Sequence, residues 1–73
     1  MKSREAVLEY LASDMRVASL TAGDALVGLA PPMSLMLTQE DQSFFRRHAE
    51  EPCHEVARAC KAGHVWHGNE NKK

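Results

Sequence analysis

The chain has 73 residues, of which 44% are hydrophobic and 26% are charged, and its formal net charge is −1. This length allows one small domain with little room for an enclosed pocket, which disfavours an enzyme. The chain also lacks the excess of Lys and Arg that neutralises phosphates, which disfavours a self-sufficient nucleic-acid-binding protein. Two cysteines are too few for a disulfide-rich scaffold, and no segment has the pattern of a signal peptide or a membrane span, so we expect a cytoplasmic protein.

The first predicted helix begins after Ser3, in the segment SREAVLEYLAS. Serine is a favoured N-cap because its hydroxyl accepts a hydrogen bond from a free N–H of the first turn. Apolar residues then recur at helical spacing and predict one buried face: Val7, Leu8, Leu11 and Met15.

A second helix is predicted over residues 22 to 29, with Thr21 as its cap and Pro31 and Pro32 forbidding its continuation. Its expected apolar face is Ala25, Leu26 and Leu29. Short apolar runs lie on either side of this helix. RVASL is interpreted as extended, and MSLML is either a buried strand that pairs with it or an irregular core segment, with a short extended piece favoured.

Two more helices are predicted in the second half of the chain. One spans roughly residues 39 to 50, because TQED resembles a capping box and the order of acidic then basic residues suits the helix dipole. The other spans residues 53 to 62, after Pro52 and before a stop at Gly63. Its apolar positions recur at helical spacing: Cys53, Val56, Ala57 and Cys60.

These elements predict a mostly α fold, a single small domain of three to four helices with one short extended pair, in an order also compatible with a helix-turn-helix. The compact domain is expected over residues 1–66, and residues 67–73 are expected to be a disordered tail because they offer no core side chain. Trp66, at the boundary, either folds back over the core or anchors a partner.

The segment PCHEVARACKAGHVWHG, residues 52 to 68, contains both cysteines and three of the four histidines, which raises the question of a zinc site. On one helix, however, Cys53 and Cys60 would lie about 10.5 Å apart along the axis, whereas two thiolates on one zinc sit within about 4 Å and a disulfide needs less than about 7 Å. Cys60 and His64 have a workable spacing, but Gly63 is expected to end the helix between them. We therefore predict no metal, no other cofactor and two buried, apolar cysteines.

A protein-binding regulator is the function class that these features favour. The predicted partner-binding groups are polar residues around the first helix and an arginine pair: Lys2, Ser3, Arg4, Glu5, Glu9, Arg46 and Arg47. Because they lie outside the predicted core face, a charge reversal at Arg4 and Glu5 is expected to leave folding intact. No catalytic residue, membrane contact or independent sequence-specific nucleic-acid binding is expected.

The alternative is a helix-turn-helix DNA-binding regulator. Residues 17 to 45 contain no Lys or Arg, so a DNA-reading helix would have to be one of the last two. Their basic residues, Arg46, Arg47, Arg58 and Lys61, are offset by Glu50, Glu51 and Glu55.

Taken whole, the chain resembles small bacteriophage-encoded proteins that bind host RNA polymerase. The resemblance rests on length, on a tiny helical domain, on the polar start MKSREAVLEYL and on the loose end HGNENKK. It implies binding to host RNA polymerase in the host cytoplasm, inhibition of transcription initiation and antitermination, without catalysis.

Overall fold

The computed structural model describes residues 3–66, and this part of the chain is entirely helical apart from its turns. The elements, in chain order, are α1 (Arg4–Ser13), α2 (Met15–Ala18), α3 (Ala22–Gly28), the 3-10 helix η1 (Ser34–Met36), α4 (Gln39–Arg47) and α5 (Cys53–Lys61). No strand forms within residues 3–66; an isolated antiparallel bridge joins Thr21 to Pro52. The prediction of a small, mostly α domain is confirmed.

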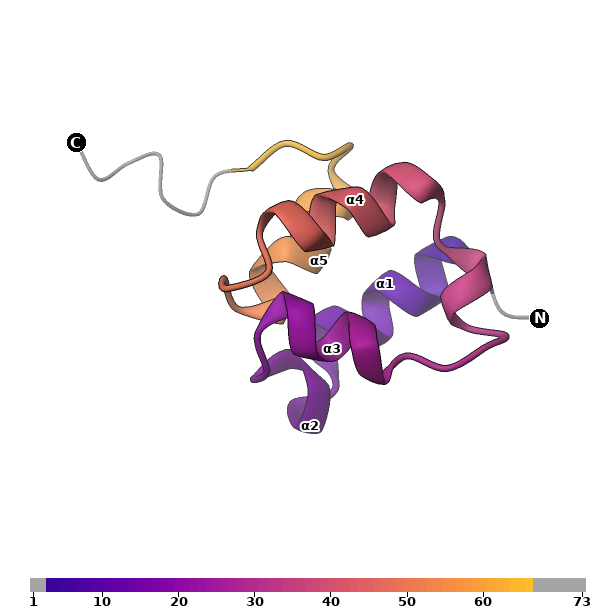
Figure 1. The fold of residues 1–73 in the computed structure, drawn as a ribbon. Coiled ribbons are helices and arrows are strands. Elements are labelled where there is room, and N and C mark those ends of the chain that lie inside the picture. The colour runs from indigo at the N-terminus through magenta and orange to yellow at the C-terminus, as the bar shows by residue number, and fades with distance from the viewer. Residues whose placement is uncertain (1–2, 67–73) are drawn as a thin grey trace.

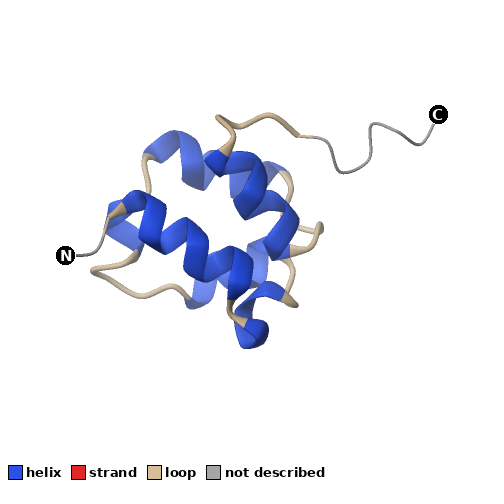
Figure 2. Cartoon of the chain, turned by 180° about the vertical axis from the view of Figure 1, so that it is seen from behind, coloured by secondary structure: helices blue, strands red, loops and turns tan. Residues whose placement is uncertain are grey.

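Helix α5 is the centre of the packing, since it contacts α1, α2, α3 and α4 (Figures 1 and 2). The largest fully buried apolar side chains of the core come from α1, α4 and α5, and α3 adds the smaller Ala22 and Ala25. The large ones are Val7, Leu8, Leu11, Phe45, Cys53, Val56 and Cys60. The apolar faces predicted for residues 53 to 62 and for the start of the first helix are therefore confirmed.

Four helices, α1, α3, α4 and α5, begin where the sequence predicts. In the first three, the start depends on a capping side chain only three residues from its partner. The hydroxyls of Ser3 and Thr21 accept hydrogen bonds from the N–H groups of Ala6 and Asp24, at 3.3 and 3.2 Å. Thr38 forms a complete capping box with Asp41, in which each side chain bonds the other residue's backbone N–H. Such caps satisfy donors that a helix leaves free in its first turn.

The predicted extended pair is wrong, and so is the burial of Met15. Asp14 has extended backbone angles that end α1, and its carboxylate accepts a hydrogen bond from the N–H of Arg16 at 2.9 Å, which starts α2. RVASL therefore begins in a helical turn, MSLML contains η1, and Met15 is 86% exposed. A local cap decides the conformation here, since runs this short carry no readable periodicity.

Helix α4 ends at Arg47, earlier than predicted, because the following turn bonds to α3. The N–H groups of Ala22 and Gly23 donate to the carbonyls of Glu51 and Ala49 at 2.8 and 2.9 Å. A Cβ on Gly23 would lie 2.9 Å from the Cβ of Ala49, so this close approach requires glycine.

After α5 the chain reverses direction. Gly63 and His64 both have positive φ angles, 91° and 68°, which confirms the predicted stop. Trp66 is half-buried against the core, so it folds back. The predicted tail, residues 67–73, lies outside the described residues. No helix in residues 3–66 is both long and apolar enough to cross a membrane.

Candidate functional site

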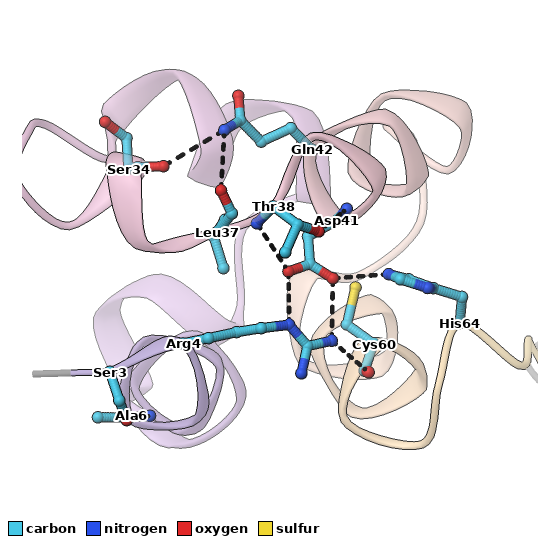
Figure 3. Close-up of polar contacts among 10 residues, drawn as sticks. All are labelled: Ser3, Arg4, Ala6, Ser34, Leu37, Thr38, Asp41, Gln42, Cys60 and His64. Atoms are coloured by element: carbon cyan, nitrogen blue, oxygen red, sulfur yellow. Dashed lines mark hydrogen bonds and ion pairs between the residues drawn. The ribbon is translucent and has the colours of Figure 1, made fainter.

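The most concentrated group of polar contacts surrounds Asp41, the only charged residue that is fully buried within residues 3–66. The Arg4 guanidinium donates to both carboxylate oxygens, from Nε to Oδ2 at 2.6 Å and from Nη2 to Oδ1 at 3.0 Å. The N–H of Thr38 donates to Oδ2 at 3.0 Å, and Nε2 of His64 lies 2.6 Å from Oδ1 (Figure 3). We call Arg4, Asp41, Cys60 and His64 the Asp41 cluster.

The helix ends bring the Asp41 cluster together. Arg4 is the first residue of α1, Asp41 lies in the first turn of α4, and Cys60 lies in the last turn of α5. The left-handed turn at Gly63 returns the chain, with the N–H of His64 donating to the carbonyl of Ala59 at 2.7 Å. Nη2 of Arg4 also donates to the carbonyl of Cys60 at 3.0 Å, one of the carbonyls left free at a helix C-terminus.

These contacts keep Asp41 ionised. Burial by itself raises the pKa of this carboxyl, but hydrogen bonds from Arg4, from the backbone N–H of Thr38 and from His64 outweigh burial and hold the pKa well below its usual range. The Asp41 cluster therefore contains a buried anion held by a bidentate Arg whose side chain is 32% exposed.

Cys60 adds a thiol to this anion. Burial, followed by the nearby Asp41 charge, raises the pKa of Cys60 to about 12, so the thiol keeps its proton at neutral pH. Its Sγ, an oxygen of Asp41 and a ring nitrogen of His64 all lie within 4.8 Å of one another. These three residues are therefore the described group that could hold a metal ion.

Aromatic rings cover the side of the Asp41 cluster where His64 lies. The rings of Phe44 and His64 have centroids 5.4 Å apart, and Trp66 stacks on His48 at 4.6 Å with an interplanar angle of 23°. The Arg47 guanidinium lies 5.6 Å from the centroid of the Phe44 ring. Packing of Trp66 and His48 thus holds the returning chain against α4.

A second surface feature is an apolar groove that residues of α1, α2 and α3 line. It has a volume of about 110 Å³ and is lined by Tyr10, Val17, Leu20, Asp24, Ala25, Gly28 and Leu29. Asp24 is the only charged residue of this lining. Two of the lining side chains are large and partly exposed: Tyr10 at 36% and Leu20 at 41%.

The structure places the predicted partner-binding residues in different surroundings. Lys2 lies outside the described residues. Ser3 caps α1, and Glu9 forms an ion pair with Lys61. The structure argues against the expectation that charge at Arg4 can be reversed without affecting folding, because Arg4 pairs with the buried carboxylate of Asp41. The residue pattern of α1 alone does not reveal this partner on another helix.

Glu5, Arg46 and Arg47 are exposed. The arginine pair lies in the last turn of α4, whereas Arg4 contacts its first turn. The two predicted groups of charges therefore lie at opposite ends of this helix and do not form one patch.

No family model, no curated protein and no solved structure gives a significant match to the chain. The resemblance to phage proteins that bind RNA polymerase stays a prediction.

Proposed function

We propose that the chain is a small, non-catalytic protein-binding regulator, and that it docks through the apolar groove between α1 and α3. The observation that carries this proposal is the exposure of large apolar side chains around that groove. Tyr10 and Leu20 line it while partly open to solvent. Exposed apolar side chains that gather beside a groove are typical of protein interaction sites.

Val27 lies on α3 next to Gly28 of the groove, although it is not one of the lining residues. It is 88% exposed and lies three residues after Asp24 on α3, which places both residues on the same side of the helix. So exposed a side chain contributes little to packing within the monomer. If a partner buried it, the apolar area removed from water would stabilise the complex by about 25 cal/mol per Å².

The size and charge of the groove indicate the kind of side chain that would bind in it. A volume of about 110 Å³ is below the roughly 300–1,000 Å³ of small-molecule sites and suits one apolar side chain of a protein segment. Asp24 at the rim complements a basic residue next to that side chain. We propose that the segment belongs to RNA polymerase, the partner that the phage resemblance implies, and that binding inhibits initiation and promotes antitermination.

Binding of the purified chain to purified bacterial RNA polymerase, measured by biolayer interferometry, tests the proposal. Leu20→Asp and Val27→Asp should each weaken the complex at least tenfold, because a carboxylate would be desolvated in the interface and would lie near Asp24. Leu35→Asp is the matched control: Leu35 is 76% exposed in η1, outside the groove, and its variant should bind like the wild type.

Three results would contradict this proposal. Absence of polymerase binding would exclude the named partner. Full binding by both Leu20→Asp and Val27→Asp, together with loss in Glu5→Lys or Arg46→Glu, would instead support the charged surface predicted from the sequence. A DNA complex that weakens steeply with salt and is lost in Arg58→Glu would support the helix-turn-helix alternative.

A further inference from the structure

We propose that Asp41, Cys60 and His64 form a zinc-binding site, with a water molecule as the fourth ligand. The three side chains come from α4, from the last turn of α5 and from the returning chain, and Figure 3 shows the sulfur of Cys60 beside the carboxylate and the imidazole. This site is independent of the apolar groove, so the two proposals can fail separately.

The donor atoms already lie close to the distances that zinc requires. Tetrahedral bonds of about 2.0–2.3 Å place pairs of N, O and S ligands roughly 3.3–3.6 Å apart. Here the three donors lie within 4.8 Å of one another, and Nε2 of His64 is 2.6 Å from Oδ1 of Asp41. Inserting the ion therefore requires Nε2 of His64 and Oδ1 of Asp41 to move apart from their hydrogen-bond distance to the ligand spacing.

Of the three proposed ligands, His64 is the one most free to move when the ion enters. The His64 side chain is 24% exposed and follows the end of α5, whereas Asp41 and Cys60 are fully buried within packed helices. His64 also borders an open hollow of about 480 Å³ along α4, lined by Gln39, Glu40, Ser43 and Arg47. Water can reach the fourth coordination position from this hollow.

The chemistry of the three donors fits zinc. A thiolate, an imidazole and a carboxylate are ordinary zinc ligands. The Cys60 thiol releases its proton to solvent when Sγ bonds the ion. Nε2 of His64, which donates its hydrogen to Asp41 in the structure, must also give up that hydrogen to solvent, with Nδ1 carrying the ring hydrogen instead, so that the Nε2 lone pair can bond the ion. Arg4 keeps its hydrogen bond to Oδ2 and holds the carboxylate in position, as groups behind metal ligands commonly do.

The sequence-based expectation was that no metal is bound, because Cys53 and Cys60 are separated along one helix and because Gly63 ends that helix between Cys60 and His64. The proposal departs from this expectation, because the left-handed turn at Gly63 returns His64 to Cys60 and Asp41 adds a third donor from another helix. Cys53 lies at the opposite end of α5, where its thiol donates to the carbonyl of Leu11 at 3.3 Å. The two cysteines are equally buried, so Cys53 is a matched control for Cys60.

Titration of the full chain with Co²⁺ alone, and then with Zn²⁺ as competitor, tests the site. One equivalent of Co²⁺ should produce a thiolate-to-cobalt charge-transfer band, and Zn²⁺ should abolish it. Cys60→Ser should eliminate the band and Cys53→Ser should leave it unchanged. His64→Gln, at a position where the side chain is only partly buried, should weaken Co²⁺ binding at least tenfold while the far-UV circular dichroism stays that of the wild type.

Two outcomes would overturn the proposal. One is a folded wild-type chain that shows no saturable band at millimolar Co²⁺. The other is a band that survives in folded His64→Gln with unchanged affinity, or that is lost equally in Cys53→Ser, since either result would place the ion elsewhere.

Discussion

The two ends of α5 are held by different kinds of interaction. At its start, backbone groups and small residues dominate: the N–H of Cys53 donates to the carbonyl of Leu20 at 2.7 Å, and Gly23 packs against Ala49. At its end, charged side chains dominate, with the buried carboxylate of Asp41 held by Arg4. One end thus depends on close steric fit, and the other depends on keeping a buried charge compensated.

This difference determines which substitutions each end tolerates. A buried charge that loses its partner costs several kcal/mol, because desolvation is no longer offset by a nearby opposite charge. A backbone hydrogen bond has no side chain to remove, so that end is sensitive to added volume. Single substitutions can therefore test the two ends separately.

The largest expected effect is at the charged end. Arg4→Met should lower the free energy of unfolding by about 3 kcal/mol, measured by urea denaturation, because Asp41 would stay buried without its cation. Arg16→Met is the matched control, since Arg16 is 88% exposed beside Asp14, and it should change stability by less than about 0.5 kcal/mol. Adding Asp41→Asn to Arg4→Met should restore part of the loss. Equal stability of the two Arg→Met variants would contradict the importance of the buried pair.

The second expected effect is a pH dependence of stability that arises from Cys53, at the start of α5. Burial raises the pKa of Cys53 from 9.0 to about 11, so the unfolded chain loses this proton at lower pH than the folded chain. The resulting stabilisation is complete below pH about 9 and is lost as pH rises towards about 11. Cys53→Ala should reduce the loss of unfolding free energy between pH 8 and pH 11 by roughly 1–3 kcal/mol. Urea denaturation across this pH range measures the effect. An unchanged slope would show that Cys53 is not desolvated.

The smallest effects come from two glycines of α3, and they have opposite signs. Gly23→Ala should cost about 1–2 kcal/mol, because the new Cβ would meet the Cβ of Ala49 at 2.9 Å. At Gly28 an added Cβ meets nothing within 4 Å, so Gly28→Ala should stabilise by up to about 0.5–1 kcal/mol through helix propensity. Thermal unfolding of both variants checks the signs, and equal shifts would show that the close approach of α3 and Ala49 is not tight.

The sequence by itself determined the features that depend on neighbours three or four residues apart. The caps at Ser3, Thr21 and Thr38 and the apolar face of α5 are of this kind, because a helix brings residues three and four apart onto one side. The sequence also predicts the role of Asp41 as the acid of a capping box. It does not predict that Asp41 is buried, because the pattern TQED also occurs on exposed helices.

Only the tertiary structure decided what lies opposite these local features. Arg4 and Asp41 are separated by 37 positions, and His64 and Asp41 by 23, so no sequence spacing relates them. The same holds for the turn after Arg47, where α4 ends because backbone groups of residues 49 and 51 bond to α3. Contacts between helices depend on how whole helix faces pack together. The sequence around a residue therefore does not indicate which residue of another helix it contacts.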